Sequence, residues 1–311
     1  MIVVRQLGVL ILMTVLAYNT ANSSPQDIAA IETIVESVGT LADRGNFEAL
    51  EDLYANEVLM DYTSLAGGEP ELKSPSAIMN EWAATLPGFD RTRHRLANIN
   101  VELNEDRAVA TADVTADHFV GELFWQVSGH YRYELARFDG DWKIIAHRFT
   151  LTDEAGTRDV FGPAAESAAA SPAPYLQRQQ TRDAVLRFLK ALEDEDMAAL
   201  ESVFAENVVQ DMPFSPEGHP KRVSGRDDLV ALYSGWPDNA ENADFTSELV
   251  FYPMQDASMV FAEFKGRVDI VPTGREYRQT YGGLFHVVDG EITLFREYYD
   301  PKPFAWAFGL E

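Results

Sequence analysis

Two histidines of this 311-residue chain, His118 and His94, lie in segments that alternate like β-strands and have small or apolar neighbours. In "RAVATADVTADHFV", residues 107–120, the even positions before His118 are alanine or valine, whereas the odd ones include threonine and aspartate. Because alternate side chains of a strand point to opposite faces, we expect His118 on the apolar, inward face. Histidine exchanges protons near neutral pH, although a single one on an apolar face is more often a core residue than a catalyst. The small alanines beneath His118 leave room for a ligand.

His94 comes directly before a second alternating run, in which Ala97, Ile99 and Val101 belong to the apolar face. His94 has the opposite parity, so simple alternation points it away from that face. A β-bulge near residues 96–98 would turn it inward, and bulges are frequent beside active sites. From alternation alone, His94 is a surface residue.

The elements that must position these histidines follow one plan. Three segments have helical periodicity: 28–41, 48–54 and 76–84. After a short strand that ends near Asp61, four segments have strand alternation: 94–104, 107–120, 123–138 and 142–152. The turns between these four are short, so neighbouring strands must be antiparallel. Helices followed by such a meander predict an α+β domain, in which the sheet can curl around the helices into a cone with an apolar pocket.

The chain carries this plan twice. Residues 41–61, "LADRGNFEALEDLYANEVLMD", resemble residues 191–211, "ALEDEDMAALESVFAENVVQD", at an offset of 150. The same offset carries the Asp-Gly turn at 139–140 onto 289–290. A match kept over that length without a gap indicates an internal duplication. We therefore expect two tandem cone-shaped α+β domains, each with three helices packed on a curved antiparallel sheet.

The N-terminus and one low-complexity segment set the domain boundaries. Arg5, the apolar stretch 7–17 and the small polar residues after it predict a signal peptide, hence an exported protein that is periplasmic or secreted. The segment "ESAAASPAPYLQRQQ" is typical of a linker. The expected divisions are a signal peptide at 1–23, a first domain at 27–155, a linker at 156–180, a second domain at 181–301 and a tail at 302–311.

The composition limits the partners. A formal net charge of −25 repels phosphate backbones and anionic lipids, so we expect neither nucleic acid nor a membrane surface as a partner after signal cleavage. The chain has no cysteine, which excludes disulfides. The expected partner is a small apolar or aromatic molecule.

Several short motifs carry a family resemblance. The double plan resembles the SnoaL-like members of the nuclear transport factor 2-like superfamily, and the first copy is similar to the branch that contains scytalone dehydratase, lindane dehydrochlorinase and bile-acid 7α-dehydratase. In that branch the segment similar to "LADRGNFEALEDLY" carries an aspartate that partners a catalytic histidine, and the segment similar to "TRHRLANI" carries the histidine. The resemblance assigns these roles to Asp43 and His94. We expect a hydrogen bond between their side chains.

Three further residues follow from the same resemblance. "DYTSL" matches the segment with a carbonyl-polarising tyrosine, which implies Tyr62, and "ADHFV" matches that of a second pocket histidine, His118. "AHRF" resembles the pocket-arginine segment, which implies Arg148 as a substrate-binding residue. Ala42 departs from the pattern, because scytalone dehydratase has a second tyrosine there.

These residue types suit a dehydration without metal or other cofactor. His94 removes a proton beside a carbonyl, Asp43 holds its other ring N–H, and Tyr62 bonds the developing enolate oxygen. The imidazolium, aided by His118, then protonates the leaving hydroxyl. The expected enzyme is a lyase, a dehydratase acting on a small cyclic or apolar hydroxy-carbonyl compound. Metal is not expected, because the chain has no HExxH or similarly tight ligand spacing.

The second copy lacks this set. At the offset of 150, the four catalytic candidates of the first copy become Glu193, Asp244, Val268 and Met212. Its last strand, "ITLFREYYDPKPF", resembles the phenazine-biosynthesis A/B branch, which implies Glu297 as an acid, base or substrate-binding residue. A structural ion pair between Arg296 and Glu297 is the favoured interpretation without that resemblance. His219 is expected in a solvent-exposed loop.

Two alternatives and one assembly hypothesis remain open. The protein could be a non-catalytic small-molecule-binding protein, because this fold also hosts pockets without chemistry. It could also be an isomerase or cyclase that uses Glu297 or Asp211 of the second domain. We further expect the two sheets to pack as an intramolecular pseudo-dimer, possible as a monomer in solution, with Phe124, Tyr277 and Phe285 as contact residues.

Overall fold

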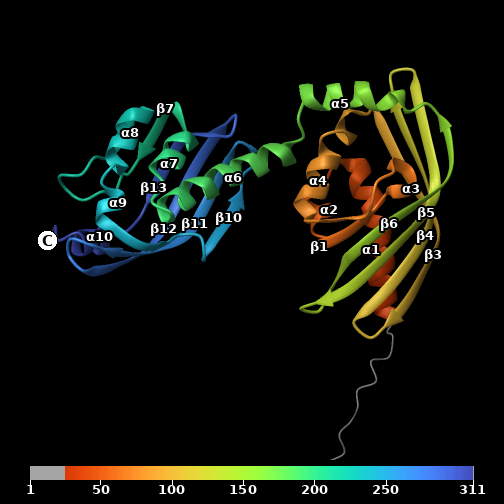
Figure 1. The fold of residues 1–311 in the computed structure, drawn as a ribbon, viewed down its shortest axis with the longest axis horizontal. Helices are drawn as coiled ribbons and strands as arrows, with labels where there is room; N and C mark the ends of the chain where they lie inside the picture. Colours follow the sequence, from red (N-terminus) through yellow and green to blue (C-terminus); the bar gives the residue numbers. More distant parts are fainter. Residues whose placement is uncertain (1–24, 311) are drawn as a thin grey trace, which may run out of the picture.

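The computed structural model describes residues 25–310, which form two α+β domains with one β-sheet each (Figure 1). The tandem arrangement and the α+β class predicted from the sequence are confirmed. The expected signal peptide at 1–23 lies outside the described residues. Within residues 25–310, no helix combines the length and hydropathy that a membrane crossing requires.

The first domain contains the longer strands. Its helices are α1 (Pro25–Arg44), α2 (Phe47–Glu51), α3 (Thr63–Ala66), α4 (Pro75–Ala83), η1 (Leu86–Gly88), η2 (Arg158–Val160) and α5 (Phe161–Ala170). Its strands are β1 (Tyr54–Asp61), β2 (Glu71–Lys73), β3 (Arg91–Asn104), β4 (Arg107–Val120), β5 (Leu123–Phe138) and β6 (Asp141–Gly156). The sheet order is β2-β1-β6-β5-β4-β3, so the four long strands form the expected meander.

The sheet is mixed rather than purely antiparallel. β1 pairs with β6 in parallel, with Met60 opposite His147. The hairpin argument holds for the long strands, but β1 is separated from β6 by most of the domain, so no tight turn fixes its direction. This pairing brings the end of β1, and Tyr62 just beyond it, beside the inward residues of β6.

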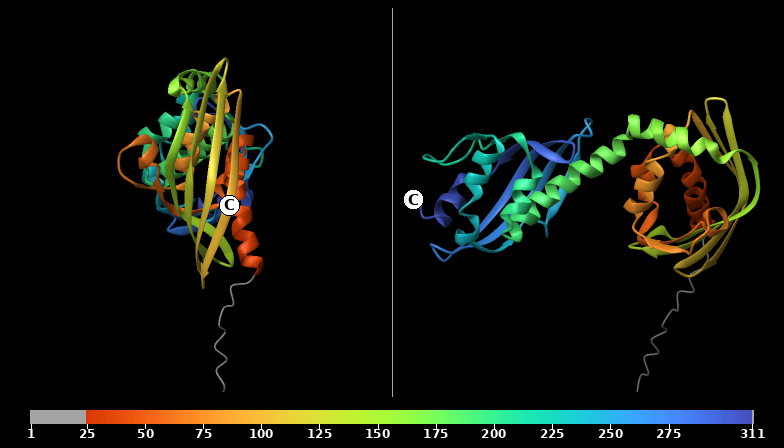
Figure 2. Two further views of the ribbon diagram at one scale, coloured as in Figure 1. Left: turned by 90° about the vertical axis from the view of Figure 1, so that its right-hand side faces the viewer. Right: turned by 45° about the horizontal axis from the view of Figure 1, so that its top comes forward.

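A helix fills the concave side of this sheet. α1 buries Ile31, Val35, Val38 and Ala42, whose spacing of four, three and four residues places them on one helical face. Opposite them, every even position of β4 from Ala108 to His118 is buried. The sheet curls around α1, as the right-hand view of Figure 2 shows.

The segment expected to be a linker is mostly folded. η2 and α5 follow β6 directly, and Val160, Ala164 and Ala168 are buried. α5 lies so close to η1 that a Cβ on Gly88 would be 1.7 Å from the carbonyl oxygen of Ala164. The segment therefore belongs to the first domain, and only about three residues separate α5 from the next helix.

The second domain repeats the plan with shorter strands. Its helices are α6 (Pro174–Glu193), α7 (Met197–Val203), α8 (Arg226–Tyr233), α9 (Trp236–Asn239) and α10 (Pro301–Ala307). Its strands are β7 (Phe204–Asp211), β8 (Arg222–Ser224), β9 (Ala240–Asp244), β10 (Leu249–Pro253), β11 (Met259–Ile270), β12 (Arg275–Val288) and β13 (Glu291–Tyr298). The residues expected to be a tail form α10, which buries Ala307.

α6 joins the two domains (Figure 1). Near its start, Tyr175 is packed in the first core, where its hydroxyl donates to Glu51 at 2.9 Å, and Arg178 pairs with Glu48 at 2.6 Å. Further along, Thr181 donates to the carbonyl of Ala257 at 2.9 Å, and Phe188 lies in the second core. One helix is thus shared by two hydrophobic cores.

The expected packing of sheet on sheet is wrong for this structure. The two sheets lie in separate domains that α6 connects, and they are not stacked against each other (Figures 1 and 2). Tyr277 and Phe285 are buried in the core of the second domain, and Phe124 packs on Phe119 within its own sheet at 5.1 Å between ring centroids. The reason is that α6 is a continuous helix, which holds the domains apart where a flexible linker would let them fold back.

Candidate active site

His94 faces the cavity because β3 contains a bulge. Ala97 pairs with Asp113 and Asn100 with Thr111, so two residues of β3 oppose one of β4. Asn98 at this point has φ of 52°, in the left-handed region that asparagine tolerates better than most residues. The extra residue reverses the parity of the strand and confirms the bulge that the sequence analysis required.

Asp43, near the end of α1, accepts three hydrogen bonds from this stretch of β3. The ring Nδ1 of His94 lies 2.7 Å from Oδ1, the backbone N–H of His94 donates to Oδ2 at 2.8 Å, and the Thr92 hydroxyl donates to Oδ1 at 2.8 Å. The predicted side-chain bond is therefore confirmed. Desolvation opposes ionisation, yet these bonds and the charge of His94 hold the pKa of the Asp43 carboxyl below its usual range.

The bond to Asp43 fixes the histidine tautomer. An ionised carboxylate only accepts hydrogen bonds, so Nδ1 carries the proton and Nε2 is left as a basic lone pair. Gly39 allows α1 to come this close, because a Cβ there would be 2.7 Å from the Cβ of His94. His94 lines the cavity, so its free nitrogen is available to a ligand.

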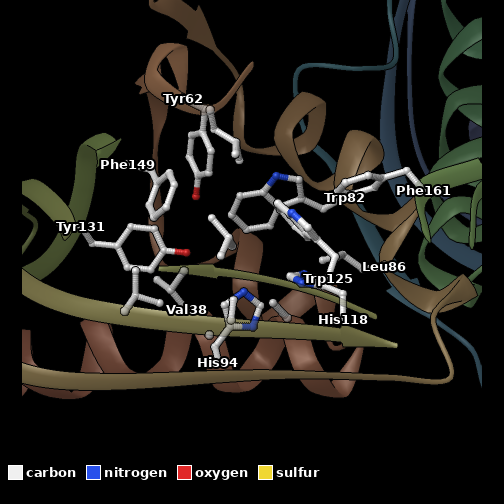
Figure 3. Close-up of a pocket in the computed structure, with 16 residues that line it drawn as sticks. Val38, Tyr62, Trp82, Leu86, His94, His118, Trp125, Tyr131, Phe149 and Phe161 are labelled. Atoms are coloured by element: carbon white, nitrogen blue, oxygen red, sulfur yellow. The ribbon is translucent and has the colours of Figure 1, made fainter. Parts of the chain in front are cut away.

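The cavity lies between the sheet, α1 and α4 and encloses about 170 Å³ (Figure 3). Its walls are mainly apolar, and the polar side chains that face it are His94, His118, Tyr62 and Tyr131, with the indoles of Trp82 and Trp125. It suits a small apolar molecule with one or two polar groups.

His118 lies in the wall of the same cavity as His94, on the inward face of β4, as predicted. Its ring stands 4.8 Å from that of Trp125, 5.1 Å from that of Phe89 and 5.9 Å from that of His94, measured between centroids. Burial and the positive charge that His94 carries when protonated lower the pKa of His118 to about 4, so His118 is neutral at neutral pH. Its Nδ1 is buried without a hydrogen-bond partner among the described residues. His118 is therefore not a proton reservoir at neutral pH.

Tyr62 faces the cavity and is held from behind by a buried histidine. The Tyr62 hydroxyl lies 3.3 Å from Nε2 of His147, and the Tyr54 hydroxyl lies 3.1 Å from Nδ1 of the same ring. Tyr54 is buried, and in the described part of the chain its hydroxyl has no other partner, so it must donate to Nδ1. Nε2–H then donates to Tyr62, whose own hydroxyl hydrogen is directed to Tyr131 in the cavity wall.

Arg148 does not line the cavity, contrary to the expectation. Its Nε donates to Asp61 at 2.6 Å, and its side chain is half-exposed. β6 has a bulge between Ile144 and Ala146, which reverses the parity after Ile144 and turns His147 inward instead. Burial lowers the pKa of His147 to about 3, and it is neutral in the folded domain.

Sequence reasoning missed several residues of this site. The alternation of β5 places Trp125, Val127 and Tyr131 on one face, and it could have indicated Trp125 and Tyr131. His147 could not be found in this way, because its position depends on a bulge. Trp82 on α4 and Phe161 on α5 reach the cavity only through tertiary packing.

In the second domain, Glu297 faces a separate cavity. The expected ion pair with Arg296 is wrong, because Arg296 pairs with Asp211 at 3.1 Å on the other side of β13. Glu297 instead accepts a hydrogen bond from Gln210 at 3.2 Å. His219, expected to be exposed, also lines this cavity, and its ring packs against Phe304 at 5.4 Å.

No group of three or more His, Cys, Asp or Glu side chains in residues 25–310 is arranged to hold a metal ion. In the first cavity His94 is bonded to Asp43, and Tyr62 is bonded to the buried His147.

Comparison with known proteins identifies the family. A family model described as a SnoaL-like domain matches residues 24–148, and a second model with the same description matches residues 185–295. The chain therefore belongs to the SnoaL-like family, with two such domains in tandem.

Its relatives each match about one domain. The uncharacterized protein YesE of Bacillus subtilis is 32% identical over 123 residues, which are 40% of this chain and 83% of YesE. The PhzA/B-like protein PA3332 of Pseudomonas aeruginosa is 26% identical over 128 residues, 41% of this chain and 89% of that protein. The crystal structure of Kfla4162 from Kribbella flavida covers 46% of this chain and 97% of its own, with 23% identity and a TM-score of 0.40.

Proposed function

We propose that the first domain is a cofactor-independent carbon–oxygen lyase, a dehydratase that acts on a small cyclic or apolar β-hydroxy carbonyl compound. The observation that carries this proposal is the orientation of His94. Its Nδ1–H is bonded to Asp43 at 2.7 Å, and its Nε2 is left free at the wall of an apolar cavity. A partly buried base that is oriented by a carboxylate suits proton abstraction better than passive binding.

The reaction begins at the carbon beside the carbonyl. Nε2 of His94 takes the proton from this carbon, and Asp43 stabilises the imidazolium that forms. The electron pair moves onto the carbonyl oxygen, which accepts a hydrogen bond from the Tyr62 hydroxyl. Since the Tyr62 oxygen already accepts from His147, its own hydrogen can pass from Tyr131 to the substrate oxygen.

The second step expels water. The enolate collapses to a carbon–carbon double bond while the β-hydroxyl leaves with the proton that His94 took up, so the imidazole returns to its neutral state. Both proton transfers use one nitrogen, which requires the proton and the hydroxyl to lie on the same face of the substrate. His118 donates an N–H to the leaving oxygen, in keeping with its neutral state.

Proton exchange separates this proposal from a non-catalytic binding protein. We would incubate the full chain with 3-hydroxycyclohexanone in D2O and follow deuterium at the carbon beside the carbonyl by NMR and the conjugated enone by ultraviolet absorbance. Both signals are expected with the wild type and absent with His94→Gln. Binding of the ketone without exchange or enone in the wild type would support the binding protein and reject the lyase.

We also propose that the chain is exported. The apolar stretch from Leu7 to Ala17 after Arg5 supports a signal peptide, which lies outside the described residues. Mass spectrometry of the protein purified from its native source is expected to find an N-terminus near residue 24. An intact Met1 contradicts the proposal.

A further inference from the structure

The second domain contains a cavity of about 450 Å³, larger than that of the first. It lies between α6, α8, α9, α10 and the inner face of the sheet, and α10 contributes Phe304 to its wall. The side chains that surround it are mainly aromatic, among them Trp236, Phe245, Phe264, Tyr281 and Phe304.

One carboxyl group, that of Glu297, faces this cavity. Gln210 donates its Nε2 to Glu297 at 3.2 Å, and Tyr233 donates its hydroxyl to Oε1 of Gln210 at 2.9 Å. Tyr233 thereby fixes which end of the amide faces Glu297. This chain of bonds engages one carboxyl oxygen of Glu297, and the other is available to a ligand.

No cation of the described residues balances this carboxyl group. The cavity has no lysine or arginine in its wall, and the neighbouring Arg296 is bonded to Asp211. Burial away from water raises the pKa of Glu297 to about 7. A carboxylate left unpaired in an apolar site is costly, so a ligand that brings a positive charge is stabilised there.

The aromatic wall favours the same charge. The faces of aromatic rings carry negative electrostatic potential and attract ammonium groups, most strongly where water is excluded. An anionic ligand would meet both these faces and the carboxylate, with no cationic side chain to receive it.

We infer that the second domain binds a small cyclic or aromatic amine in its protonated form. The ammonium group pairs with Glu297, and the ring lies among Trp236, Phe245 and Tyr281. This site is independent of the chemistry proposed for the first domain, because none of its residues contributes to the first cavity.

Other titratable groups around Glu297 share the cavity. They are His219, Tyr233, Tyr277, Tyr281 and Tyr299. Burial raises the pKa of each of these tyrosines, so all four stay neutral through the neutral range. His219 is the only one of the five that can add a positive charge, which would oppose the binding of an amine.

Three probes with one ring system test the inference. Tryptamine carries an ammonium, tryptophol a hydroxyl and indole-3-acetate a carboxylate on the same indole, and each would be titrated into the full chain by calorimetry at pH 7. Tryptamine is expected to bind about tenfold or more tightly than tryptophol, the ratio that a charge-assisted hydrogen bond provides, and indole-3-acetate not at all. Equal or tighter binding of tryptophol or indole-3-acetate, or no binding of tryptamine, overturns the inference.

Proton release gives a second readout on the wild type. An ammonium partner stabilises the ionised form of Glu297, so tryptamine binding at pH 6.5 is expected to release more than about half a proton, and at pH 8.5 almost none. Calorimetry in buffers of different ionisation enthalpy measures this number. Proton uptake at pH 6.5 would mean that the ligand prefers the protonated acid, which contradicts the inference.

A matched pair of variants assigns the effect to one residue. Glu297→Gln keeps the shape and removes the charge, and it is expected to weaken tryptamine at least about tenfold while leaving tryptophol unchanged. Glu291→Gln, at the start of the same strand but outside the cavity, is expected to leave both affinities unchanged. Unaltered tryptamine binding in the Glu297→Gln variant overturns the assignment.

Discussion

Asp43 holds His94 by two bonds at once, one to the imidazole Nδ1 at 2.7 Å and one to the backbone N–H at 2.8 Å. The second domain keeps the bonds from a carboxylate to the backbone but not the bond to a histidine ring. Glu193, at the equivalent end of α6, accepts hydrogen bonds from the backbone N–H groups of Phe245 and Thr246 at 2.6 and 2.7 Å. A carboxylate that anchors the incoming strand is therefore common to both domains, whereas the histidine that it orients exists in only one.

This comparison distinguishes the structural role of Asp43 from the catalytic role that we propose for it. Asp43→Asn keeps an acceptor but loses the charge that holds Nδ1–H, so α-proton exchange is expected to fall more than about 100-fold. The free energy of unfolding is expected to fall by about 1–3 kcal/mol, because a buried hydrogen bond to a charged group is lost. Urea denaturation and the deuterium assay measure the two effects.

Glu193→Gln is the matched control for that experiment. It weakens the equivalent strand anchor in the second domain and is expected to lower stability by a similar amount. It touches no residue of the first cavity, so deuterium exchange is expected to be unchanged. Equal loss of exchange in both variants would show that Asp43 acts only through stability.

Two neutral buried histidines predict how stability depends on pH. The pKa of His118 is about 4 and that of His147 about 3, both below the value of a histidine in the unfolded chain. Between pH 6.5 and 4 the unfolded chain therefore binds protons that the folded domain does not. Stability is expected to fall with decreasing pH through this window, by up to about 1.4 kcal/mol per pH unit for each histidine.

Removal of one histidine tests this slope. His118→Gln is expected to make the dependence shallower in urea denaturation measured from pH 4.5 to 7. His130→Gln, at an exposed position of β5 where the imidazole contacts Asp113 at 2.7 Å, is the control for the loss of a histidine outside the core. A slope that does not change with His118→Gln would mean that His118 is charged in the folded state.

The hydroxyl of Tyr54 is expected to control Tyr62 through His147. Tyr54→Phe removes the donor to Nδ1, so the other tautomer becomes accessible and Tyr62 can turn its hydrogen away from the cavity. We expect kcat to fall about tenfold with KM nearly unchanged, since the lost interaction forms in the transition state. Tyr133→Phe is the control, because its buried hydroxyl has no partner among the described residues and its loss is expected to be neutral or stabilising.

The alternating patterns predicted much of the first cavity. The even positions of β4 predicted that its alanines and His118 face inward. The 150-residue offset predicted the two tandem domains. Where the prediction of inward-facing residues failed, one inserted residue had reversed the alternation of side chains along the strand. The bulge in β6 exchanged His147 for Arg148, and no periodic pattern contains that information, because a bulge is fixed by pairing with a neighbouring strand.

The segment after β6 failed for a different reason. Its alanine, proline and glutamine content is typical of linkers, yet Val160, Ala164 and Ala168 recur every four residues and form one buried face. Small side chains carry a weak hydrophobic signal, and their packing depends on how closely Gly88 lets the chain approach. The composition of this segment therefore did not reveal that it folds into a helix with one buried face.

The bulge in β3 is the feature on which the proposed chemistry depends most directly. Asn98 holds φ at 52°, and its Nδ2 donates to Asp113 at 2.7 Å. A β-branched side chain in this conformation costs about 1–3 kcal/mol, so Asn98→Val is expected to shift the strand toward regular pairing and to turn His94 out of the cavity. Asn98→Gly loses the hydrogen bond but accepts the backbone angle, so it is expected to keep the dyad. We therefore expect exchange activity to be nearly lost with Asn98→Val and largely kept with Asn98→Gly, with the His94 imidazole NMR signals shifted only in the former. Equal activity in the two variants would show that the bulge does not set the direction of His94.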